Sequence, residues 1–198
     1  MKTYLKISVI LASIALVCAL ILAGLNMLTS PVIAKNNEQK EIETIQKIYE
    51  DYNSEKSKNV ALDGLNSAIT KKIIAKDESD NLLGTLYIVT GKNAYGTITL
   101  MVAISDENTV EQVEFLENGQ SFAGTVKTHV KTSYHSSKES VYELNPYKSG
   151  EAVEVGSLTK EEVNNEDIVD VNCGATFGAK LVRELVNIAL DDAMKGGN

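Results

Sequence analysis

The feature that most constrains this chain is a stretch near its amino terminus, residues 7–34, that contains no charged side chain. A transmembrane helix needs about 20 predominantly apolar residues, and this stretch supplies them. Lys2 and Lys6 precede it, and an excess of positive charge marks the cytoplasmic side of a span. We therefore expect a single-pass anchor in the cell membrane over residues 1–34, with a cytoplasmic amino terminus and an extracytoplasmic remainder.

A cleaved signal peptide is the alternative, because Ala34 and its neighbours stand where a signal peptidase would cut. The uncharged run is longer than the roughly 7–15 apolar residues of a signal peptide, which favours a retained anchor. A lipid-modified cysteine is disfavoured, because the bulky Val17 directly precedes Cys18.

The segment after the anchor is acidic. The whole chain has a formal net charge of −8, and two lysines precede the uncharged stretch, so residues 35–198 carry −10. This charge argues against nucleic acid as a partner. The length of the segment suits one globular domain that buries its own core.

The few cysteines and histidines limit the possible chemistry. Cys18 lies in the anchor and Cys173 far from it, so we expect no internal disulfide. His129 and His135 have no cysteine nearby for a zinc-type site and no glycine-framed serine for nucleophilic catalysis. We therefore expect neither a metal site nor a catalytic side chain.

The order of sequence patterns predicts an α+β fold. Isoleucines and tyrosines at helical spacing predict an amphipathic helix over residues 36–52. Short apolar runs then predict an antiparallel sheet, with strands at 69–76, 83–90, 96–104 and 109–116 and turns at 77–81, 91–93 and 105–108. A last amphipathic helix should end at Gly196-Gly197. The predicted division is an anchor at 1–34, an amphipathic linker helix at 35–60 and a domain at 61–198.

The segment before the last helix, residues 170–176, reads Asp-Val-Asn-Cys-Gly-Ala-Thr. It resembles the attachment motif of the FMN-binding domain family, whose members include the G subunit of Rnf complexes and the C subunit of sodium-pumping NADH:quinone reductases. Residues 22–34 and the order of anchor, helix, sheet and terminal helix are also similar to the Rnf G subunit. Cys173 stands where the family commonly has Ser or Thr, and Gly178-Ala179 replaces its usual Ser/Thr pair.

This resemblance implies a covalent flavin, with FMN joined to Thr176 by a phosphoester bond. It also implies that Gly174 and Ala175 allow close approach to the backbone, that Cys173 lies beside the attachment point, and that Asp170 belongs to the signature read by a flavin transferase. Ser121, in a loop at 120–125, corresponds to a family segment near the flavin and is a candidate contact.

The residues allow two readings of Thr176 without the family. A threonine at the start of a helix lies where free N–H groups and the helix dipole favour a phosphate. The plainer reading is that Thr176 only caps the helix. Tyr87, Tyr95 and Phe115 are interpreted as aromatic residues of the core or sheet surface rather than flavin contacts, since strands use such residues routinely.

The leading functional hypothesis is an electron-carrier subunit, rather than an enzyme by itself, in an ion-translocating Rnf-type complex. Its partners would be other membrane subunits of the complex, with a flavin transferase for maturation. The alternatives are a stand-alone extracellular FMN-binding electron-transfer protein, and a membrane-tethered binding module without flavin whose motif is vestigial.

Overall fold

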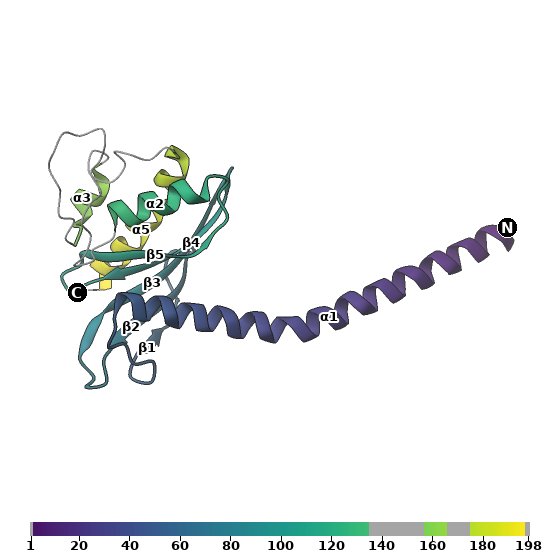
Figure 1. The fold of residues 1–198 in the computed structure, drawn as a ribbon, viewed down its shortest axis with the longest axis horizontal. Helices are drawn as coiled ribbons and strands as arrows, with labels where there is room; N and C mark the ends of the chain where they lie inside the picture. Colours follow the sequence, from purple (N-terminus) through teal and green to yellow (C-terminus); the bar gives the residue numbers. More distant parts are fainter. Residues whose placement is uncertain (1, 135–156, 166–174, 197–198) are drawn as a thin grey trace. The chain divides into compact units, whose positions relative to one another are not determined.

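The computed structural model describes residues 2–134, 157–165 and 175–196 (Figure 1). The chain divides into two compact units, Met1–Glu43 and Thr44–Asn198. Helix α1 (Lys2–Ile48) forms the first unit and continues for its last residues into the second.

The described side chains of the first unit's apolar stretch are exposed along α1. By length and composition this helix can cross a membrane, a test that a signal sequence also passes. Its hydroxyl groups bond within the helix: Ser13 Oγ donates to the carbonyl of Val9 at 2.8 Å, and Thr29 Oγ1 donates to that of Leu25 at 2.9 Å. These bonds satisfy polar groups that would be costly in lipid.

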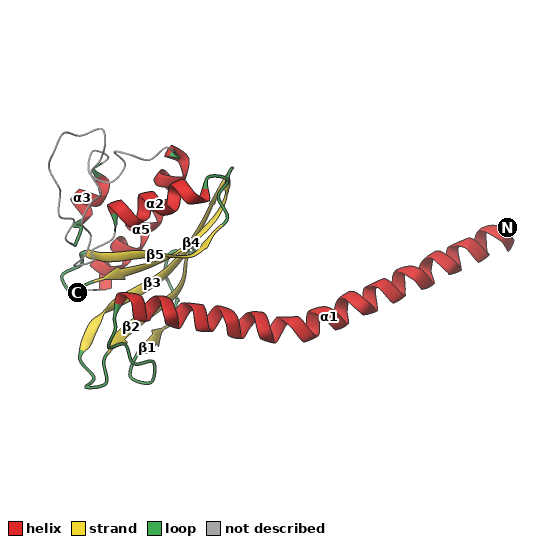
Figure 2. Ribbon diagram, in the orientation of Figure 1, coloured by secondary structure: helices red, strands yellow, loops and turns green. Residues whose placement is uncertain are grey.

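The second unit is built on a five-stranded antiparallel sheet, so the α+β fold class is confirmed (Figure 2). Strand order follows the sequence, and each strand pairs with the next. The strands are β1 (Lys58–Val60), β2 (Ile69–Lys76), β3 (Leu82–Asn93), β4 (Gly96–Ile104) and β5 (Val110–Asn118). The spans predicted for β2 and β4 are confirmed, and β1 was not predicted because three residues carry too little periodicity.

The predicted turn at 91–93 is wrong, because these residues continue β3 and pair with residues 96–98 of β4. The connection is instead the two-residue turn at Ala94 and Tyr95. Gly91 is a packing contact and not a turn residue. A Cβ at this position would lie 2.9 Å from Leu185 Cδ2, so the absence of a side chain lets the helix approach the strand.

Two apolar clusters lie on the sheet. The larger cluster holds side chains of β3, β4 and β5 together with the helices α2 (Ala123–Ser133), α3 (Lys160–Asn164) and α5 (Thr176–Gly196). The smaller cluster joins Ile45, Ile48 and Tyr49 to buried residues of β2, β3 and β4. Helix α5 begins at the motif and packs along β3 and β4, and this packing fixes where its amino-terminal end lies.

Candidate functional site

Helix α5 begins at Thr176, whose side chain is exposed. The N–H groups of Gly178 and Ala179 both donate to the carbonyl oxygen of Ala175, at 2.9 and 3.0 Å. The first N–H groups of a helix have no acceptor inside it, and the helix dipole places partial positive charge at this end. Thr176 therefore presents its hydroxyl where a phosphate group is favoured.

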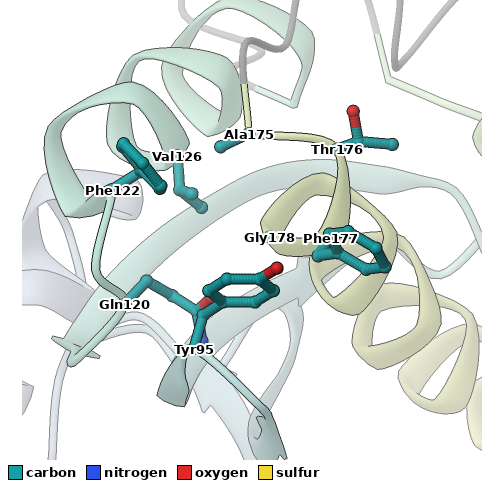
Figure 3. A pocket seen from close by; sticks show the side chains of 8 residues that line it. All are labelled: Tyr95, Gln120, Phe122, Val126, Ala175, Thr176, Phe177 and Gly178. Atoms are coloured by element: carbon teal, nitrogen blue, oxygen red, sulfur yellow. The ribbon is translucent and has the colours of Figure 1, made fainter.

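A pocket of about 190 Å³ opens beside this helix start (Figure 3). Three parts of the chain line it: Tyr95 comes from the β3–β4 hairpin, residues 175–178 come from the start of α5, and Gln120, Phe122 and Val126 come from the segment leading from β5 into α2. We call this the aromatic pocket, because three of its side chains are aromatic rings.

The rings form the sides of the aromatic pocket. The centroids of Tyr95 and Phe177 lie 5.4 Å apart, with their planes tilted by 31°. Phe122 lies on the other side of the pocket from Phe177, and the Thr176 hydroxyl points away from Tyr95 at the rim (Figure 3). The pocket thus combines apolar ring faces with a hydroxyl at its edge.

The side-chain amide of Asn93 joins the parts that line the pocket. Its Nδ2 donates to the carbonyl oxygen of Phe177 at 3.1 Å. Its Oδ1 accepts from the N–H of Tyr95 at 2.8 Å and from Gln120 Nε2 at 3.0 Å. Gln120 is buried, and its Nε2 also donates to the carbonyl oxygen of Gly96 at 2.7 Å. These bonds fix the spacing between hairpin, loop and helix.

Gly178 allows α2 and α5 to pack closely behind the pocket. A Cβ at Gly178 would lie 2.4 Å from Val126 Cγ2, closer than real side chains approach. The next residue, Ala179, is buried as well. The departure of Gly178-Ala179 from the family's common Ser/Thr pair therefore has a packing reason in this chain.

The structure describes half of the candidate site residues. Thr176 and Ala175 line the aromatic pocket. Ser121 does not line it, although its N–H and Oγ both donate to the carbonyl oxygen of Tyr95, at 3.0 and 3.3 Å. Asp170, Cys173 and Gly174 lie outside the described residues.

Sequence reasoning missed the aromatic lining of the pocket. Tyr87 is buried and Phe115 half-buried, as predicted, but Tyr95 is exposed at the hairpin turn and lines the pocket. Phe122 and Phe177 received no role. Their positions carried a usable signal, since each directly follows a candidate site residue, Ser121 or Thr176.

The described acidic, basic and histidine side chains do not line the aromatic pocket. Within residues 2–134, 157–165 and 175–196, no three His, Cys, Asp or Glu side chains come together as possible metal ligands. His129 on α2 is buried, and burial lowers its pKa to about 4, so the imidazole is neutral at pH 7. Its ring meets Tyr134 edge-on, with centroids 5.9 Å apart.

Two family models match the chain. One describes the RnfG N-terminal region and matches residues 1–48, and the other describes the FMN-binding domain and matches residues 94–191. The second match contains every residue that lines the aromatic pocket. The chain is an RnfG-like FMN-binding protein. No match was found among curated proteins.

The family to which the chain belongs indicates its general function. The RnfG-like protein is a flavin-binding electron-transfer subunit of a multi-subunit Rnf-type complex, and its apolar amino-terminal helix marks it as membrane-anchored.

The described residues fit an FMN group. The start of α5 offers N–H groups and a hydroxyl for the phosphate end. Tyr95, Phe122 and Phe177 offer ring faces for the flavin, and the buried Gln120 offers an amide. Among the described residues, no charged side chain lines the aromatic pocket, so these residues would offer the flavin apolar walls with a few polar groups, as small-molecule sites commonly provide.

Proposed function

We propose that this protein carries FMN covalently on Thr176 and passes electrons between membrane subunits of an ion-translocating Rnf-type complex. The observation that carries the proposal is the position of Thr176, which is exposed at the first residue of α5 and lies at the rim of the aromatic pocket. A threonine that only caps a helix does not require a pocket beside it.

Thr176 and the two residues before it each have a proposed role in flavin attachment. The Thr176 oxygen would hold the FMN phosphate in a phosphoester bond, formed when a flavin transferase moves FMN from an activated flavin donor: the hydroxyl loses its proton and the donor's phosphate leaving group departs. The helix start would stabilise the negative phosphate. The small side chain of Ala175 leaves room for a flavin transferase to reach that oxygen, as Gly174 would beside it. The flavin supplies the reversible electron transfer, while the protein holds and orients it.

The proposed arrangement in the membrane follows from charge. Lys2 and Lys6 precede the apolar stretch, so the amino terminus would be cytoplasmic and the FMN-binding domain extracytoplasmic. Covalent attachment suits that compartment, where a lost cofactor would not be replaced from a concentrated pool. The division into an anchor at 1–34, a linker at 35–60 and a domain at 61–198 belongs to the same proposal, although the linker is helical only as far as Ile48 and ends in strand β1.

The test compares Thr176→Ala with Thr176→Ser in protein produced together with a flavin transferase. The alanine variant should lose the flavin fluorescence that denatured wild-type protein retains on a gel, because the acceptor oxygen is gone. The serine variant should keep it. Folding should survive both changes, since substitutions at exposed positions usually alter stability by less than about 0.5 kcal/mol. Fluorescence on denatured Thr176→Ala protein would place the attachment elsewhere.

A further inference from the structure

Among the described residues of the second unit, the exposed aromatic side chains gather at one place. Phe122 is 62% exposed, Phe177 63% and Tyr95 42%, and all three line the aromatic pocket. The other described Tyr and Phe side chains of that unit are buried or half-buried: Tyr49, Tyr52, Tyr87, Phe115 and Tyr134. Apolar surface left in water is costly, and such a cluster marks a binding surface.

The ring geometry restricts how a flat ligand enters. A ring inserted between two others needs about 7 Å between their centroids, because stacked carbon atoms contact at about 3.5–4.0 Å on each side. The ring centroids of Tyr95 and Phe177 are 5.4 Å apart, too close for a third ring to enter between them, so the two rings act as one wall. Phe122 lies across the pocket from Phe177 (Figure 3). The space between Phe122 and the Tyr95–Phe177 pair is therefore where a planar group would lie inside the pocket.

The polar groups of the pocket fit a heterocycle. Gln120 is 6% exposed, and its Nε2 is already bound to Asn93 and Gly96. The Oε1 atom of this amide is the one left to accept a hydrogen bond from a ring N–H. Thr176 stands at the rim, where a chain linking ring and phosphate would leave the pocket.

The pocket is too small for a whole flavin nucleotide. Its volume is about 190 Å³, whereas pockets that bury most of a drug-sized ligand hold about 300–1,000 Å³. The described residues alone would therefore enclose only part of the ring system.

We propose that Tyr95 and Phe177 on one side and Phe122 on the other form the stacking site for the isoalloxazine ring of the FMN carried on Thr176. This rests on the proposed function and adds the residues that hold the ring. Asn93 is the positioning residue, because its amide ties the backbone of Tyr95 and Phe177 to Gln120.

The first experiment uses full-length flavinylated protein in detergent. Tyr95→Leu, Phe122→Leu and Phe177→Leu are compared with wild type after normalising for bound flavin, and Phe115→Leu is the control because it removes a ring outside the pocket. Aromatic stacking quenches flavin fluorescence. Losing one ring contact should raise the ratio of free to stacked flavin about two- to tenfold, while Phe115→Leu leaves it unchanged.

The second experiment removes the dependence on covalent attachment. Free FMN is titrated into two proteins, the Thr176→Ala variant and the double variant that also carries Tyr95→Leu. The dissociation constant should rise about two- to tenfold when Tyr95 is replaced. Circular dichroism of each variant confirms that the exposed substitutions leave the domain folded.

The outcomes separate the two proposals. Unchanged fluorescence and FMN affinity in every pocket variant, with flavin still on Thr176, would overturn the stacking site and leave the proposed function intact. Unchanged flavin fluorescence with slower electron transfer would show that the three rings contact a partner subunit and do not stack on the flavin. If wild-type protein carries no covalent flavin, the proposed attachment to Thr176 is wrong. In that case, a higher dissociation constant for free FMN after Tyr95→Leu would still support the stacking site.

Discussion

Gln120 Nε2 lies 3.0 Å from Asn93 Oδ1, and this bond between two side-chain amides joins a loop that follows β5 to the end of β3. Asn93 also holds the carbonyl of Phe177 on α5. One side chain thus connects three segments that are far apart in the sequence. The position of the α5 start relative to the rest of the aromatic pocket depends on it.

Asn93→Ala should destabilise the domain by about 1–3 kcal/mol, because it removes partners from the buried Gln120 amide and from the N–H of Tyr95. Urea unfolding followed by circular dichroism measures this loss. Asn59→Ala is the matched control, since Asn59 is exposed on β1 and such changes stay within about 0.5 kcal/mol. Equal stability of the two variants would contradict the role given to Asn93.

Much of the fold could be predicted because its signals are local. Short apolar runs bounded by turn residues predicted the ends of β2 and β4, and helical periodicity identified α5. The error at 91–93 arose because glycine signals both turns and close packing. At Gly91 the packing partner is Leu185, which lies on a distant helix and is invisible to local pattern.

The site could be predicted only in part for the same reason. The attachment motif is contiguous, so Thr176 could be named from its neighbours. The pocket beside it is assembled from three segments, and the exposure of Tyr95 depends on a hairpin turn at 94–95 rather than at the predicted 91–93. In a sequence, an aromatic residue of a binding site cannot be distinguished from an aromatic residue of the core. The two differ in burial, which only the structure gives.

Gly178→Ser should destabilise the domain by about 1–3 kcal/mol, since the new side chain meets Val126 in a packed contact. Gly124→Ser is the control, because a Cβ at Gly124 has no atom within 4 Å. Adding Val126→Ala to Gly178→Ser should recover part of the loss, with a coupling of about 0.5–3 kcal/mol in a double-mutant cycle of unfolding free energies. Strict additivity would show that the two residues do not clash.

Orientation in the membrane can be tested with protease added to intact cells. The charges of Lys2 and Lys6 predict that residues 35–198 are outside and become cleaved. A cytoplasmic marker protein should remain intact in the same sample. Protection of this segment until the membrane is broken would reverse the proposed topology.

His129 should make the domain lose stability as the solution becomes acidic. Burial lowers its pKa to about 4, whereas an unfolded chain has a histidine pKa of about 6.5. Between these values the unfolded state binds the extra proton, so stability falls as pH falls, by up to about 1.4 kcal/mol per pH unit and about 3 kcal/mol in total. The contribution is complete above pH 6.5. His129→Gln removes this titration but keeps the carboxylates that also respond to acid. Urea unfolding of both proteins between pH 7 and 4 should therefore give the variant a shallower slope, and equal slopes would mean that the imidazole is not buried in its neutral form.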